Sequence, residues 1–212
     1  MRKPLIICLA LAVPVLAMTY VAGTSTSYTF KDPKGVNSIS FTLDGRLEQI
    51  SGIANGITGD VTFDPENPSA TRGKIVVPVK SITTSHANMT EHLHGSMWLD
   101  MAKYPNVEFV IKKVSNVKKT GSKDATWTMS VTGDFSMHGV TKSITIPVTV
   151  THLPGELSKR NRGQRGDLMV LRSKFQIKRS DFGIGRGERF AIVSDEIDVS
   201  FSIGSFAPVP RD

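Results

Sequence analysis

The chain has 212 residues, with 26 basic and 19 acidic side chains and a formal net charge of +7. Its single cysteine, Cys8, lies in an apolar segment at the N-terminus, so the rest of the chain carries no thiol. This distribution excludes a disulfide framework, an iron–sulfur site and a cysteine nucleophile. A moderately basic domain of this kind is attracted to anionic lipid head groups.

Residues 1–23 have the pattern of a secretory signal peptide. Arg2 and Lys3 precede an apolar run that ends in small residues. An uncleaved membrane anchor is the alternative, because the run approaches the length that spans a bilayer, although Pro14 interrupts it. Both interpretations place residues 24–212 beyond the inner membrane, so we expect a periplasmic protein that does not meet nucleic acid.

Apolar and polar residues alternate along most of the remaining sequence. Period-two alternation rich in Val, Ile and Thr predicts strands with one wet and one dry face. Turn signals at 64–68, 119–122 and 138–139 separate several of these strands. The apolar members, in chain order, are Ile39, Phe41 and Leu43; Ile57, Val61 and Phe63; Ile75, Val77 and Val79; Val107, Phe109 and Ile111; Trp127, Met129 and Val131; Ile144, Ile146, Val148 and Val150; and Ile197, Val199, Phe201 and Ile203.

This pattern predicts an all-β fold in a single domain over residues 24–212. Consecutive strands on short turns favour antiparallel connections, and their dry faces must be buried in a barrel or a sandwich. We favour the barrel. One segment departs from the pattern, because Met89, Leu93 and Met97 recur at helical spacing. A short helix is therefore expected near residues 87–97, covering part of the sheet or one barrel end.

The sequence offers little for catalysis or for a metal or other cofactor. It contains no Gly-x-Ser-x-Gly elbow, no His-Glu-x-x-His and no nucleotide-binding loop, so we do not expect an enzyme. His86, Glu91, His92 and His94 lie close together, but a zinc site needs three or four converging ligands. We interpret them as exposed polar residues around the short helix, and His138 as a turn residue.

Two groups of basic residues have a candidate role. Arg186 and Arg189 stand in a glycine-rich bend, where they are candidates for contact with a ligand head group. The second group lies in the polar loop 154–166. Its basic side chains are either simply solvated or dock the protein to an anionic membrane. Its basic members are Lys159, Arg160, Arg162 and Arg165.

An ordered series of short motifs resembles the YceI-like family of exported polyisoprenoid-binding proteins. No single motif is decisive, but together they cover residues 28–203 nearly end to end. They are Tyr28-Thr29-Phe30; Gly59-Asp60-Val61-Thr62-Phe63-Asp64-Pro65; Glu91-His92-Leu93-His94; Met97-Trp98-Leu99-Asp100; Lys103-Tyr104-Pro105-Asn106-Val107-Glu108-Phe109; Gly133-Asp134-Phe135-Ser136-Met137-His138-Gly139-Val140-Thr141-Lys142; and Ser180-Asp181-Phe182-Gly183-Ile184-Gly185, followed by the last alternating strand.

The resemblance implies a lipocalin-like barrel of about eight strands that binds a long isoprenoid lipid, polyprenyl or quinone-like, as a carrier or store. The alternative is a structural or stress-protective envelope protein whose barrel is filled by its own side chains. The oligomeric state stays open, with a homodimer among the alternatives. Under the carrier hypothesis, the candidate ligand contacts on the dry strand faces are Ile39, Phe41, Phe63, Val77, Phe109, Trp127, Met129, Ile146 and Phe201.

Overall fold

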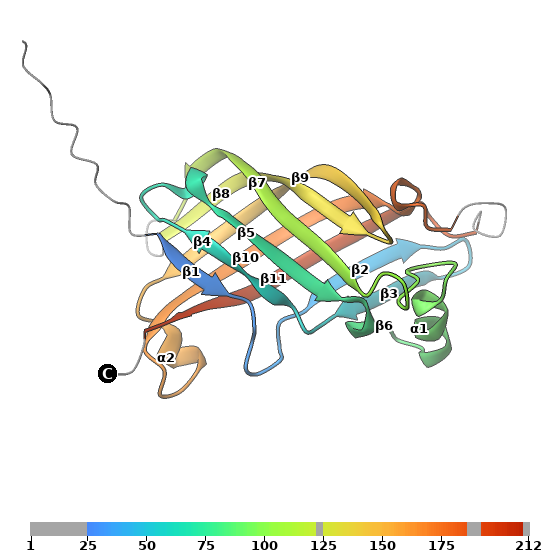
Figure 1. Ribbon diagram of the computed structural model, residues 1–212, viewed down its shortest axis with the longest axis horizontal. Coiled ribbons are helices and arrows are strands. Elements are labelled where there is room, and N and C mark those ends of the chain that lie inside the picture. The colour runs from blue at the N-terminus through green and yellow to red at the C-terminus, as the bar shows by residue number, and fades with distance from the viewer. Residues whose placement is uncertain (1–24, 122–124, 186–191, 210–212) are drawn as a thin grey trace, which may run out of the picture.

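Antiparallel strands account for most of the computed structural model (Figure 1). The structure describes residues 25–121, 125–185 and 192–209. The segment 1–23, interpreted above as a signal peptide or anchor, lies outside the described residues. Within the described ranges, no helix has the length and apolar character needed to cross a membrane.

The strands form one continuous antiparallel sheet. Its order is β1-β4-β5-β7-β8-β9-β10-β11-β2-β3-β6, and β1 also pairs with β11. The bounds are β1 (Thr26–Thr29), β2 (Ile39–Asp44), β3 (Gln49–Ala54), β4 (Thr58–Phe63), β5 (Arg72–Pro78), β6 (Ile82–Thr84), β7 (Asn106–Lys119), β8 (Ala125–Met137), β9 (Val140–Leu153), β10 (Gly166–Lys178) and β11 (Glu196–Pro208).

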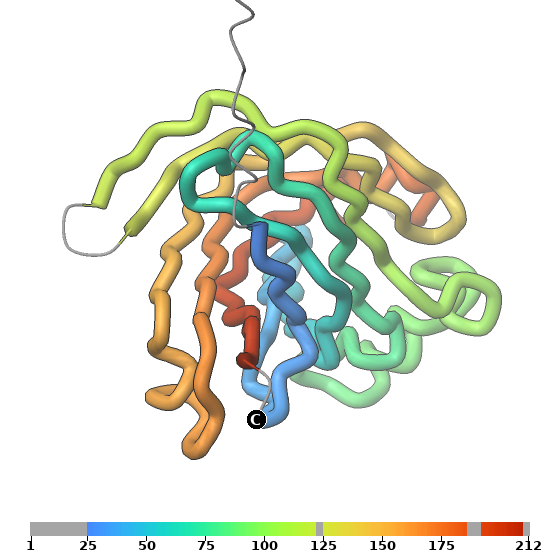
Figure 2. Tube along the Cα trace, turned by 60° about the vertical axis from the view of Figure 1, so that its left-hand side comes forward, coloured from blue at the N-terminus to red at the C-terminus, as the bar shows by residue number. Residues whose placement is uncertain are grey.

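The β1–β11 pairing closes the sheet into a barrel. Thr29 lies opposite Phe206, so the first eight strands in the sheet order form a complete ring. Figure 2 shows these strands wrapped around one interior, with β1 in blue beside the red end of β11. The prediction of a single antiparallel barrel of about eight strands is therefore confirmed.

The long strand β11 joins two parts of the wall. Its C-terminal part meets β1, whereas its N-terminal part pairs with β2, from Asp198 opposite Thr42 to Phe201 opposite Ile39. The strands β2, β3 and β6 thereby extend the wall at one end of the barrel (Figure 1).

Short helices lie at the two ends of the barrel. The helix α1 (Ala87–His94) follows β6, and α2 (Leu157–Arg160) follows β9 at the opposite end (Figure 1). The helix expected near 87–97 is thus present, but it ends at His94, before Gly95. Met97 lies beyond the helix with 60% of its surface exposed, so the prediction that it belongs to the apolar face of the helix is wrong.

Three single turns of 3-10 helix complete the described part of the fold. They are η1 (Pro68–Ala70), η2 (Val79–Ser81) and η3 (Arg179–Phe182). Phe182 of η3 is fully buried, and its ring meets that of Phe135 in β8 at a centroid distance of 5.4 Å. This turn therefore closes the barrel wall where β9 and β10 diverge.

Candidate functional site

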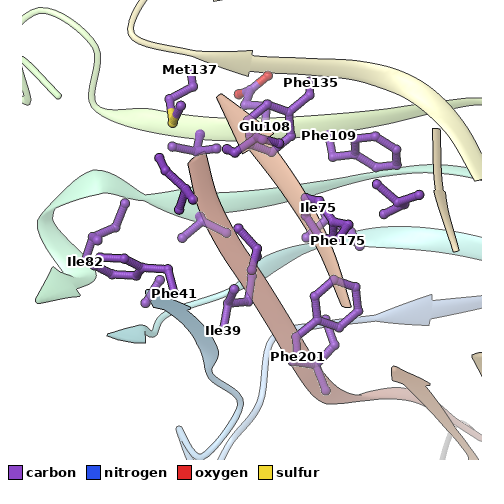
Figure 3. A pocket seen from close by; sticks show the side chains of 18 of the residues that line it. Ile39, Phe41, Ile75, Ile82, Glu108, Phe109, Phe135, Met137, Phe175 and Phe201 are labelled. Atoms are coloured by element: carbon purple, nitrogen blue, oxygen red, sulfur yellow. The ribbon is translucent and has the colours of Figure 1, made fainter. Parts of the chain in front are cut away.

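An apolar cavity of about 290 Å³ occupies the barrel interior. Its walls come from the inward faces of the strands, where aliphatic and aromatic side chains converge (Figure 3). Several of these side chains, among them Phe41, Phe109 and Phe201, are only partly buried although they point inward. The open volume between the lining side chains shows that they do not fill the barrel completely.

Eight of the nine predicted contact residues line this cavity. The period-two pattern placed them correctly because successive side chains in a strand point to opposite faces. Whether they contact a ligand stays a prediction. The eight are Ile39, Phe41, Phe63, Val77, Phe109, Met129, Ile146 and Phe201.

Trp127 is the exception among the predicted contacts. Its ring is buried but packs edge-to-face on Phe63 at a centroid distance of 5.4 Å, outside the cavity lining. The ammonium of Lys119 lies 5.6 Å from the centroid of the Trp127 ring. Trp127 has the inward orientation that the alternation predicted, but it lies too close to the closed end of the barrel to reach the cavity.

That end is closed by buried aromatic side chains. Tyr28 and Phe30 are almost completely buried there, and Tyr28 meets the ring of His152 edge-to-face at 6.0 Å. Burial, and secondarily the carboxylate of Asp167, raises the pKa of the Tyr28 hydroxyl far above its usual range, so Tyr28 stays neutral. These residues form a floor beneath the cavity.

The opposite end of the cavity is covered by α1 and the residues after it. Met89, Leu93, Trp98 and Leu99 all line the cavity from this segment. Sequence reasoning identified the helix but missed Trp98 and Leu99, since the loop that carries them has no periodicity. Their only sequence signal was the Met-Trp-Leu-Asp motif.

Polar contacts attach α1 to β6. The hydroxyl of Thr90 accepts a hydrogen bond of 2.9 Å from the backbone N–H of Thr84. The Nε2 atom of His94 lies 2.8 Å from the carbonyl oxygen of Ile82, and the helix buries no residue completely. The His94 side chain therefore attaches the helix to β6. Its partial burial departs from the expectation of exposed polar residues, which holds for His86, Glu91 and His92. In the described ranges, no three His, Cys, Asp or Glu side chains converge as metal ligands would.

Arg179 is the cation in the described cavity lining. Its guanidinium donates to the carbonyl oxygens of Ser194, Ile184, Gly185 and Val193. These bonds join the chain after η3 to the segment just before β11. They also surround the buried positive charge with carbonyl dipoles. The arrangement makes Arg179 a structural residue of the barrel end.

The His138-Gly139 motif is also structural. These residues form the turn between β8 and β9, as predicted for His138, and its Nδ1 atom lies 3.0 Å from the carbonyl oxygen of Phe182. The ring of Tyr104 lies edge-on to that of His138 at 5.2 Å. The motif thus connects the β8–β9 turn to both η3 and the loop before β7.

The basic loop is less free than its sequence indicates. Lys159 donates to Glu156 at 2.7 Å, and Arg160 pairs with the buried carboxylate of Asp32 at 2.9 Å. Arg162 and Arg165 are exposed. Two of the four cations proposed for membrane docking are therefore engaged within the protein, and the loop lies at the end of the barrel opposite α1 (Figure 1). Arg186 and Arg189 lie outside the described residues.

Sequence comparison extends over nearly the whole described chain. The family model of the YceI-like domain matches residues 26–204. A UPF0312 protein of Pseudomonas savastanoi pv. phaseolicola is 30% identical over 186 residues, which cover 88% of this chain and 86% of that protein. A UPF0312 protein of Yersinia pestis is 30% identical over 141 residues, covering 64% and 68%.

Solved structures share the fold at low identity. BcnA of Burkholderia cenocepacia superimposes with a TM-score of 0.63 at 23% identity, covering 79% of this chain and 95% of that chain. A polyisoprenoid binding domain from Saccharophagus degradans, implicated in plant cell wall breakdown, superimposes with a TM-score of 0.63 at 12% identity, covering 87% and 99%. At these identities the likeness supports the barrel fold alone.

Proposed function

Because this chain belongs to the YceI-like family, whose barrel it shares, we propose that it binds a long isoprenoid-type lipid inside the barrel and acts as a carrier or store without catalysing a reaction. The observation that carries this proposal is the apolar cavity between the aromatic floor and α1. A hydrocarbon needs only shape and an apolar lining, since each Å² it removes from water contributes about 25 cal/mol.

The size and flexibility of the cavity bear on how a long chain is accommodated. Its volume of about 290 Å³ is at the lower end for small-molecule pockets, so a long isoprenoid requires the lining to adjust. Met89, Met129, Met137 and Met169 all contribute to the lining. Methionine side chains change shape at low cost, and their presence supports a cavity that widens around its ligand.

The same proposal includes the location of the protein and the orientation of the bound lipid. The N-terminal segment 1–23 supports export to the periplasm. A charged head group needs a partner that the apolar lining does not offer, because the guanidinium of Arg179 is already engaged by backbone carbonyls. We therefore expect the head group to stay outside the cavity, at the α1 end. Arg186 and Arg189 keep their candidate role as head-group contacts, and Arg162 and Arg165 their candidate role in attraction to anionic lipid.

The competing hypothesis of a filled barrel that acts through its surface predicts no internal cavity. Extraction of the protein purified from its native envelope, followed by mass spectrometry, separates the two hypotheses. A stoichiometric isoprenoid or quinone supports the carrier, and a protein that is consistently empty contradicts it.

A binding measurement with a matched pair of variants gives a second test. Val199 lines the cavity, whereas Val76 faces outward on β5. Val199→Trp should fill the cavity and weaken binding of solanesol, a polyprenol, at least tenfold, and Val76→Trp should leave it unchanged. Equal affinity in both variants, with both folded by circular dichroism, would show that the lipid does not occupy the barrel.

A further inference from the structure

Two aliphatic side chains project into solvent at the end of the barrel that carries α1. Leu47, in the turn between β2 and β3, is 88% exposed, and Ile192, just before β11, is 50% exposed. Their segments are joined, because the N–H of Arg46 donates to the carbonyl oxygen of Ile192 at 2.7 Å and that of Ser194 to Asp44 at 2.6 Å. The exposed Leu47 is therefore held on an anchored turn.

These exposed side chains lie close along the chain to residues of the cavity lining. Leu43 and Ile50, on the two strands that lead to the Leu47 turn, both line the cavity. On the α1 side, Met97 is 60% exposed, and its neighbour Trp98 lines the cavity. We call Leu47, Met97 and Ile192 the apolar rim. The rim therefore lies at the end of the cavity that α1 covers, whereas the aromatic floor closes the other end.

We propose that the apolar rim inserts shallowly into the surface of a phospholipid bilayer and that the lipid ligand enters and leaves the cavity there. This inference rests on the proposed function, because a ligand that water rejects has its reservoir in a bilayer. Insertion also removes from water the aliphatic surface that the barrel leaves exposed. The neighbours of Leu47 in the turn are Arg46 and Glu48, of opposite charge, so the contact does not depend on anionic lipid.

The proposal differs from docking through the basic loop. The loop that follows α2 carries Arg162 and Arg165, and α2 lies at the end of the barrel opposite α1 (Figure 1). Contact through that loop would be weakened by salt and would require anionic lipid, since salt screens exposed charges. Contact through the rim should occur on neutral phosphatidylcholine and persist in salt.

The test measures vesicle binding and ligand transfer separately. Leu47→Asp is compared with Val209→Asp, which changes an equally aliphatic residue, 59% exposed, near the C-terminus of β11 at the far end. All variants are purified from the exporting cell in the same N-terminal form, so any contribution of that segment cancels. We expect Leu47→Asp to lower co-flotation with phosphatidylcholine vesicles and the rate of solanesol transfer between them at least fivefold, and Val209→Asp to change neither.

Each other outcome has a defined meaning. Unchanged flotation and transfer in Leu47→Asp would overturn the rim proposal. A loss that appears only in an Arg162→Glu, Arg165→Glu variant, and only with anionic vesicles, would assign docking to the basic loop instead. A shift in sedimentation caused by Leu47→Asp would make the rim an interface between copies of this chain. If wild-type protein floats through Leu47 but binds no solanesol in solution, the proposed ligand is wrong and the rim stands.

Discussion

The hydroxyl of Ser173 donates a hydrogen bond of 2.6 Å to the carbonyl oxygen of Pro147, at the point where β9 and β10 separate. The two strands pair only between Leu168 opposite Leu153 and Arg172 opposite Thr149. Proline has no N–H to donate to the ladder, so pairing stops there. The side-chain hydroxyl makes the last link between the two strands.

This link should contribute measurably to stability. Ser173→Ala removes the hydroxyl from a buried position on the inner face of β10, and we expect a loss of about 1 kcal/mol in the free energy of unfolding. Ser202→Ala, on the exposed face of the neighbouring strand β11, serves as the control and should change the value by less than about 0.5 kcal/mol. Urea denaturation measures both. Equal effects would show that the bond to Pro147 contributes nothing of its own.

The two tryptophans should report ligand binding differently. Trp98 lines the cavity, whereas Trp127 packs on Phe63 toward the closed end, outside the cavity lining. Binding of solanesol is therefore expected to change the fluorescence of Trp98 and to leave that of Trp127 nearly constant. In Trp98→Phe the ligand-dependent change should disappear, and in Trp127→Phe it should remain. The reverse result would place the ligand at the opposite end of the barrel.

The alternation along the strands was enough to predict most of the fold and of the cavity lining, because a residue's odd or even position along a strand decides which face it occupies. Parity does not tell how deep a residue lies along the barrel. For this reason it grouped Trp127 with Met129, although only Met129 reaches the cavity. Depth depends on which strand is opposite which, and those registers are set by pairings between residues far apart in sequence.

The loops were harder to predict for a related reason. The four cations of the basic loop look alike in the sequence, but Arg160 pairs with Asp32, 128 residues away along the chain. Trp98 likewise lies in a loop without periodicity, so only its motif marked it. In both cases the role of the residue depends on a tertiary contact that local patterns do not encode.

The Asp32–Arg160 pair predicts how stability depends on pH. Burial alone would raise the pKa of the Asp32 carboxyl, but hydrogen bonds from the backbone N–H groups of Lys34, Val36 and Asn37, together with Arg160, hold the pKa below its usual range. A carboxylate with a lowered pKa stabilises the folded state above its unfolded pKa of about 3.9, and this contribution is lost as the pH falls through the lower folded value.

Asp32→Asn should therefore be less stable than the wild type at neutral pH, and the difference should shrink as the pH falls below about 4. Chemical denaturation at a series of pH values measures this convergence. Glu48→Gln, at the exposed turn between β2 and β3, is the control and should leave the free energy of unfolding almost unchanged at neutral pH. A difference between wild type and Asp32→Asn that stays constant with pH would mean that the charge of Asp32 is not what stabilises the loop.

Gly139 should tolerate no side chain, for two separable reasons. Its φ of +74° is unfavourable for other residues, and an added Cβ would collide with the ring of Tyr104. Gly155 has a nearly equal φ of +71° but open space around it, so Gly155→Ala measures the backbone term alone, about 1 kcal/mol. Gly139→Ala should lower the free energy of unfolding clearly more, as measured by thermal or urea unfolding, because the turn must also displace Tyr104 from His138.

Adding Tyr104→Ala to Gly139→Ala removes the collision, so the double variant should lose less stability than the sum of the two single losses. Strict additivity would show that the contact with Tyr104 is not what requires glycine at this turn.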